Sequence, residues 1–133
     1  MTKVDRWLRE NAFLKMHVYI GLQNLNDGFD VPDRAYFSEA EFTLVLERCK
    51  TIGIIVDSIE PWKNKQFFAE VSWSNYSNQV SDVHWYINAF ENFVTMGEDL
   101  IYSASLTVPM KFLEADDEPN DWEYVFMNAL RGA

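Results

Sequence analysis

Apolar residues recur at three- and four-residue spacing between Ser38 and Gly53, which predicts the clearest helix of the chain. Ser38 and Glu41 have the spacing of a capping box at its start, and Gly53 suits its end. The apolar stripe of this helix consists of Phe42, Val45, Leu46, Cys49 and Ile52. We expect this stripe to lie against the core.

The same spacing predicts three further helices, over residues 2–10, 82–95 and 120–130. Ser81 or Asp82 can cap the second of these, and Asn120 with Glu123 can cap the third. Their apolar sides are formed by Val4, Trp7 and Leu8, by Val83, Tyr86, Ile87, Phe90, Phe93 and Val94, and by Trp122, Val125, Phe126, Ala129 and Leu130.

Residues 54–59 are β-branched and rich in apolar residues, and residues 66–73 and 100–108 alternate apolar with other residues, so strands are predicted over all three ranges. Residues 61–65, which begin with Pro61, suit a loop that joins the first two strands as a hairpin. Residues 16–23 also alternate, which suits a strand, although the first helix could instead continue through them. Residues 24–36 are rich in Asn, Asp, Gly and Pro and are expected to form a surface loop.

The predicted order of elements is therefore α, an uncertain β, α, β, β, α, β, α. Helices with one apolar face, interspersed with half-buried strands, indicate an α+β fold. We expect two layers, with a small, largely antiparallel sheet of three or four strands covered by helices. The length of 133 residues suits a single domain over residues 1–133.

The composition fits a cytoplasmic protein with a packed core. Hydrophobic residues make up 48% of the chain and aromatic residues 16%, which is unlike a disordered chain. The first residues lack the apolar segment of a secretory signal, and no apolar run reaches the length of a membrane span. Cys49, the single cysteine, cannot form an intramolecular disulfide and is expected to be buried.

The net charge of −10 is unevenly distributed. Residues 1–65 hold 10 acidic and 9 basic residues, whereas residues 66–133 hold 11 acidic and 2 basic residues, so the two halves carry −1 and −9. A field of this sign repels nucleic acids and anionic lipids and speeds the capture of basic partners. We therefore expect a protein partner, and neither a nucleic acid nor a membrane.

No nucleophile elbow, P-loop, dinucleotide fingerprint, zinc-protease helix or paired cysteine motif is present. Cys49 could be a nucleophile with His17 or His84 as its base, but a thiol on an apolar stripe is inert. No catalytic residue and no cofactor is predicted.

Two arrangements of polar side chains are more typical of a solvent-exposed surface than of a functional site. His84, Asn88 and Glu91 share one helix face, yet no further histidine or cysteine supports a metal site there. Glu60 and Glu70 flank the predicted hairpin and could face each other as an acid and base pair, but carboxylates are common at strand ends. No metal ligand is predicted.

Two segments have the composition of recognition elements. Residues 73–79 combine aromatic and small polar side chains, as adaptable contact loops do, and Trp62 lies in the neighbouring turn. The alternative is that these aromatic side chains fold back and cap the sheet edge. The predicted contact residues here are Trp62, Trp73, Asn75 and Tyr76.

The second segment is the acidic run over residues 114–123, which contains no basic residue. Some of these carboxylates suit the start of the last predicted helix. The remaining ones could dock onto a basic protein surface, where charge steers the encounter. The predicted contact residues here are Asp116, Asp117, Glu118 and Asp121.

In this layout and in the segments 36–42, 59–62 and 99–109, the chain resembles the small acidic immunity proteins that bacteria make against their own toxins. The resemblance is one of type, without a diagnostic motif. It implies a non-enzymatic inhibitor that covers a basic toxin domain. One alternative is a small-ligand-binding domain or small enzyme with a pocket lined by Trp62, Trp73, Tyr76 and Trp85. Another is a module that forms a homodimer.

Overall fold

The computed structural model describes residues 2–76 and 83–114. These residues form an α+β fold, in which helices pack against a four-stranded, largely antiparallel sheet. The predicted fold class is therefore confirmed. The last predicted helix, over residues 120–130, and its capping residues lie outside the described residues, as do Ser81 and Asp82.

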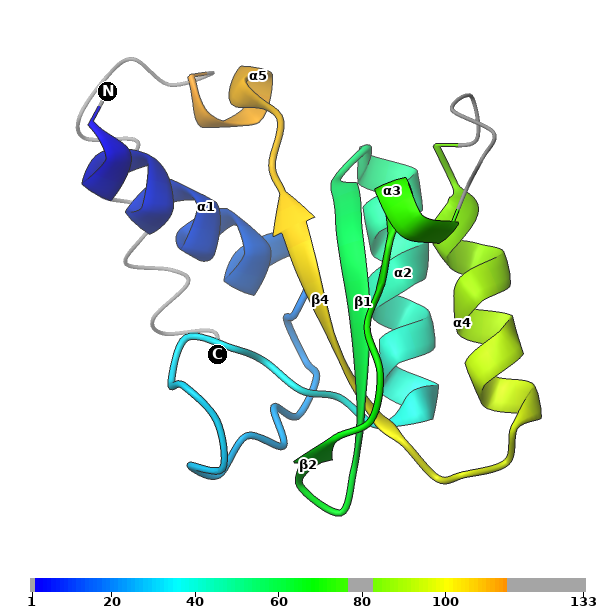
Figure 1. The fold of residues 1–133 in the computed structure, drawn as a ribbon. Coiled ribbons are helices and arrows are strands. Elements are labelled where there is room, and N and C mark those ends of the chain that lie inside the picture. Colours follow the sequence, from blue (N-terminus) through cyan, green and yellow to red (C-terminus); the bar gives the residue numbers. More distant parts are fainter. Residues whose placement is uncertain (1, 77–82, 115–133) are drawn as a thin grey trace.

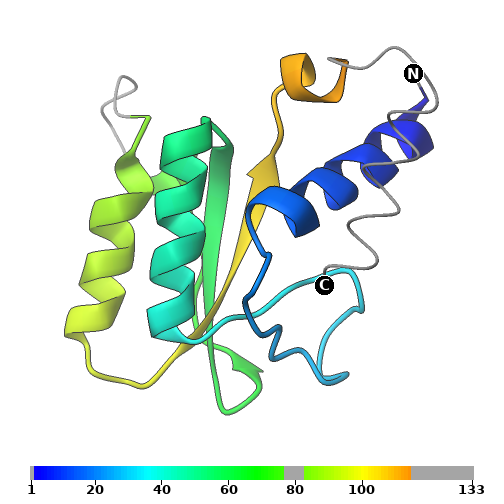
Figure 2. The same ribbon diagram turned by 180° about the vertical axis from the view of Figure 1, so that it is seen from behind.

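Strand β1 (Ile55–Lys63) is the centre of the sheet, and β4 (Ile101–Thr107) pairs with it antiparallel along its whole length. The short strands β2 (Gln66–Phe67) and β3 (Val71–Ser72) follow each other along its opposite edge. Helices α2 (Glu39–Ile52) and α4 (Trp85–Thr95) lie side by side on one face of this sheet (Figures 1 and 2).

The predicted hairpin is present, but its loop is shorter than expected. Strand β1 continues through Pro61 and Trp62, and the turn consists of Asn64 and Lys65 alone, both with positive φ. Proline is unusual in a central strand because it has no N–H to donate. Here the carbonyl of Pro61 accepts the N–H groups of both Phe68 and Ala69, at 3.1 and 3.3 Å.

That shared acceptor marks a β-bulge. Between the pairs Ile59–Val71 and Trp62–Phe67, β1 has two residues and the opposite segment has three. Because the N–H and C=O of one strand residue point to the same side, the missing N–H of Pro61 faces the bulge, where ladder pairing is interrupted. The strand predicted over 66–73 is thereby divided into β2 and β3.

Helix α2 matches its prediction closely. The Ser38 hydroxyl accepts the N–H of Glu41, and Gly53 ends the helix in the left-handed conformation. The expected capping box is only half formed, because the Glu41 carboxylate accepts the N–H of Gln23 at 2.9 Å instead. This bond attaches the start of the surface loop to the helix.

The strand considered over residues 16–23 is wrong, and the alternative of a longer helix is right as far as His17. Helix α1 (Lys3–His17) begins with a capping box of Thr2 and Asp5. Turns follow it, and of the alternating apolar residues only Val18 is fully buried, whereas Ile20 is 44% exposed. Val18 anchors the end of the helix in the core. In a short segment, alternation of apolar residues cannot distinguish such an anchored helix end from a strand.

The remaining elements are two short helices, α3 (Trp73–Tyr76) and α5 (Met110–Leu113). Helix α5 packs against α1, where the Arg9 side chain donates to the carbonyl of Leu113 at 2.9 Å. One core joins the described helices and the sheet; its largest fully buried members include Trp85, Tyr86, Tyr102, Phe37 and Phe42. In residues 2–76 and 83–114, no helix has the length and apolarity that a membrane crossing requires.

Candidate functional site

The face of the sheet opposite α2 and α4 is partly covered by the loop over residues 24–36. Ile59 points into the core, so its neighbours Glu60 and Trp62 project from the other face. Ser103 of β4 is paired with Glu60 and is buried. Ser105, further along the strand, is exposed. The loop therefore covers one end of this face.

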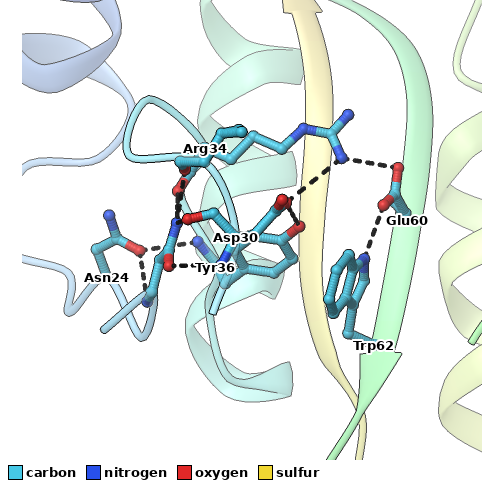
Figure 3. Close-up of polar contacts among 8 residues, drawn as sticks. Asn24, Asp30, Arg34, Tyr36, Glu60 and Trp62 are labelled. Atoms are coloured by element: carbon cyan, nitrogen blue, oxygen red, sulfur yellow. Dashed lines mark hydrogen bonds and ion pairs between the residues drawn. The ribbon is translucent and has the colours of Figure 1, made fainter. Parts of the chain in front are cut away.

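Arg34 joins the loop to the central strand (Figure 3). Its Nη1 donates to Oε2 of Glu60 at 2.9 Å, and the other carboxylate oxygen of Glu60 accepts the indole N–H of Trp62 at 2.7 Å. The side chain of Glu60 is 9% exposed. Both oxygens of this nearly buried carboxylate thus have a donor, as a buried charge requires.

Tyr36 and Asp30 continue the network inside the loop. The Tyr36 hydroxyl donates to the Asp30 carboxylate, and this bond holds the pKa of Asp30 below its usual value. Burial, together with Asp30, raises the pKa of Tyr36. The ring of Tyr36 also packs on that of Trp62, with 5.3 Å between ring centroids, and Phe29 contacts both rings.

Asparagine side chains fix the backbone of this loop. The Asn24 side-chain oxygen accepts the N–H of Tyr36 at 2.9 Å, and the Asn26 amide donates to the carbonyls of Val31 and Arg34 at 2.8 and 2.9 Å. These side-chain hydrogen bonds satisfy backbone groups of the loop that have no partner strand. The composition of residues 24–36 predicted a loop correctly, but it did not show this internal order.

Two lysines of the hairpin are also paired. Lys65 bonds to Asp27 of the loop at 2.8 Å, and Lys63 bonds to Glu98. With the Arg34 and Glu60 pair, these contacts fix the hairpin tip from both sides. The network has its hydrogen-bonding partners within the chain, so we assign it a positioning role. Glu60 therefore pairs with Arg34 and not with Glu70, whose side chain is exposed.

Beside this network, Phe67 and Phe68 present apolar surface to solvent. These residues are 58% and 37% exposed, and the rings of Phe67 and Trp62 meet edge to face, at a centroid distance of 6.3 Å. Phe67 shares the outer face with Trp62, because it pairs with Trp62 across the hairpin.

We name Trp62, Phe67 and Phe68 together the hairpin aromatic surface. The predicted contact residue Trp62 belongs to it and is half-buried. Trp73, also half-buried, packs against the core at the start of α3. The backbones of Asn75 and Tyr76 lie in α3. Asp116, Asp117, Glu118 and Asp121 lie outside the described residues.

The structure does not bring Trp62 and Trp85 together in a pocket. Trp85 is fully buried in the core, and its indole N–H donates to the carbonyl of Val56 at 3.1 Å. Trp62 instead packs with the loop residues Phe29 and Tyr36. Trp85 lies in the first turn of α4, and this turn packs against strand β1 of the sheet.

Cys49 and His17, the thiol and one of its possible bases, lie in packed surroundings. Cys49 is fully buried, as predicted, and burial raises its thiol pKa to about 12. His17 packs on Phe13, with 4.4 Å between centroids, and its pKa is lowered by burial. Within residues 2–76 and 83–114, no three His, Cys, Asp or Glu side chains gather as they would around a metal ion.

Apolar grooves occur on two other parts of the surface. One of about 680 Å³ lies between α1 and the segment that follows it, and it is lined by Trp7, Tyr19, Leu22 and Phe37 among others. Another, of about 520 Å³, lies between α2 and α4. No protein-family model, no curated protein and no solved structure matches this chain.

Proposed function

We propose that this chain is a non-enzymatic protein-binding domain, an immunity-type inhibitor that binds and neutralises a cognate bacterial toxin. The observation that carries the proposal is the exposure of Phe67 and Phe68, adjacent residues at 58% and 37%, on a hairpin fixed by the Arg34 and Glu60 network. Large aromatic side chains that are solvent-exposed on a rigid frame are typical anchors of protein interfaces.

The energetics favour a small number of strong anchors. A phenylalanine that moves from water into a partner's pocket contributes about 1.5–3 kcal/mol. The cost of ordering is small when the anchor stands on a framework that is already fixed. The short turn at Asn64 and Lys65 and the Arg34 and Glu60 ion pair provide such a framework.

The net charge of −10 supports a basic partner. Charge raises the rate of encounter, whereas buried aromatic side chains determine most of the affinity. In this proposal, Asp116, Asp117, Glu118 and Asp121 attract the toxin and the hairpin aromatic surface holds it. The site of action is the cytoplasm, which suits a chain with a single, buried thiol.

The proposal is tested by coexpression with the product of each neighbouring gene in a host that lacks both proteins. A toxin among these products should arrest growth, and coexpression of this chain should restore it. Phe67→Ser with Phe68→Ser should abolish the rescue and weaken the purified complex at least about a hundredfold. The matched control is Val4→Ser, an equally exposed apolar position on α1, 66% exposed, which should rescue fully.

Charge reversal of Asp116, Asp117 and Glu118 to lysine should slow association at low salt and have little effect at high salt. The inhibitor proposal fails if no neighbouring product is neutralised. It also fails if the doubly substituted hairpin rescues as well as the control does.

Small-ligand binding is the second candidate, and the groove beside α1 is the observation in its favour. Its volume of about 680 Å³ falls in the range of ligand pockets, and apolar rings line it together with Asn11 and Lys15. The test is a fluorescence screen with apolar metabolites. A change in tryptophan fluorescence that is absent in Trp7→Phe, together with binding of the same metabolite in calorimetry, would favour this candidate.

A further inference from the structure

The groove between α2 and α4 has two matching walls. The helices run antiparallel on one face of the sheet (Figures 1 and 2). Each wall is a stripe at the spacing of one helix face. The stripes comprise Thr43, Leu46, Glu47 and Lys50 of α2, and Ile87, Phe90, Glu91, Val94 and Thr95 of α4.

The floor of this groove is apolar. Leu46 and Phe90 are almost fully buried at its base, and Val94 leaves 37% of its surface exposed along one wall. Small-ligand sites fix their ligands with a few convergent polar groups, whereas the polar side chains here stand at the rim and the ends. From residue 43 to residue 50, an α-helix rises about 11 Å, which is two turns. The groove therefore has the length of two turns of a partner helix.

Two carboxylates line the groove, Glu47 on the wall formed by α2 and Glu91 on the wall formed by α4. Among the described residues, none of the ion pairs includes either carboxylate. Like charges on facing walls repel each other, and a cation between them would be attracted by both.

We infer that this groove binds an amphipathic helix of a partner protein, with apolar residues at i, i+3 or i+4, and i+7 on its floor and a lysine or arginine between Glu47 and Glu91. This is the helix-in-groove mode of recognition. The groove lies between α2 and α4, whereas Trp62 and Phe67 project from the opposite face of the sheet, so the inference does not depend on the proposed inhibitor function. A single partner that spans both faces is not required.

Calorimetry with a synthetic peptide tests this site. The probe is a helical peptide of leucine and lysine about 14 residues long, four turns, with leucine on one face. It should bind the complete protein, and the same peptide with glutamate in place of lysine should not. Glu47→Gln with Glu91→Gln should weaken binding roughly tenfold. Val94→Asn should also weaken it, since apolar contact is lost.

The control is Asp33→Asn with Glu70→Gln, which makes the same change in net charge at exposed positions elsewhere. Unchanged affinity in this control supports the groove. An equal loss in the control would show that net charge alone attracts the peptide, and would overturn the inference, as would affinity that survives Val94→Asn. Thermal unfolding of each variant separates loss of binding from loss of fold. Phe67→Ser with Phe68→Ser should leave peptide binding unchanged, so this result and the toxin assay can fail separately.

Discussion

Arg34 and Glu60, separated by 26 positions in sequence, form a 2.9 Å ion pair that fastens a surface loop to the central strand of the sheet. The arginine side chain is 37% exposed and the glutamate side chain 9%. The pair therefore lies at a boundary, with one partner facing water and the other almost fully enclosed. Its carboxylate also orients Trp62, so a contact in the loop determines how the hairpin aromatic surface is presented.

Removal of the arginine should destabilise the protein more than removal of both charges. In Arg34→Met, the nearly buried carboxylate of Glu60 loses the Arg34 donor and keeps the Trp62 indole, and we expect a loss of about 1–3 kcal/mol in the free energy of unfolding. Addition of Glu60→Gln should restore part of it. Urea unfolding of both single variants and the double variant gives the coupling energy. Strictly additive losses would show that the pair is not coupled.

Trp62→Phe should separate the ring from its hydrogen bond. Phenylalanine retains contact with Tyr36 but cannot donate to Glu60, so the free energy of unfolding should fall by about 1 kcal/mol. The comparison is Trp73→Phe at another half-buried position. If Trp62→Phe is no less stable than wild type in chemical unfolding, the indole N–H does not contribute.

Lys65→Gly should stabilise the hairpin. Lys65 has a φ of 62°, a conformation that glycine adopts without the steric cost of a Cβ, about 1 kcal/mol. The ion pair with Asp27 that would be lost is exposed on both sides, 60% and 63%, and contributes little. Thermal unfolding should show a higher midpoint. Lys65→Ala, which loses the ion pair but keeps the strain, should not; equal destabilisation in both would show that the ion pair matters more.

Stability should decline above about pH 9. Burial raises the pKa of Tyr86 from 10.0 and that of Cys49 from 9.0, each to about 12. The folded state thus keeps protons that the unfolded state releases, so this contribution is complete below the unfolded pKa values and is lost as the pH rises towards 12. Urea midpoints from about pH 8 to pH 11 measure the slope. Tyr86→Phe should flatten it, and an unchanged slope would exclude this phenol as a cause.

The thiol of Cys49 should be unreactive in the folded protein. It is fully buried with a raised pKa, so little thiolate forms and reagents cannot reach it. At about pH 8, Ellman's reagent should label one thiol per chain only after denaturant is added. Rapid labelling without denaturant would mean that α2 opens readily.

The parts of the fold that were predictable are those with local determinants. Ser38 and Gly53 define the ends of α2 from adjacent backbone geometry, and the alternating residues on either side of Asn64 and Lys65 indicate a hairpin. The length of β1 was not predictable, because Pro61 is compatible with a central strand only opposite a bulge. A bulge depends on two segments meeting, which one segment's pattern cannot show.

The candidate site was harder to predict from the sequence than these elements of the fold. Arg34 had no distinguishing neighbours, and its pairing with Glu60 exists only in three dimensions. Trp62 was singled out for its aromatic ring, but its role in the network depends on the same pairing. The face on which Phe67 lies is determined by its cross-strand partner Trp62, which alternation within one segment does not identify. The acidic residues beyond position 114 remain a prediction.

The central position of β1 also affects the order in which the chain can fold during synthesis. Its turn with β2 closes within a few residues, but its long partner β4 begins at Ile101, and the pair Ile55–Thr107 joins residues 52 positions apart. Until that segment leaves the ribosome, one edge of β1 has no ladder partner in the described sheet. A nascent chain stalled before residue 101 should therefore expose this edge to chaperones and proteases, and release of β4 should protect it.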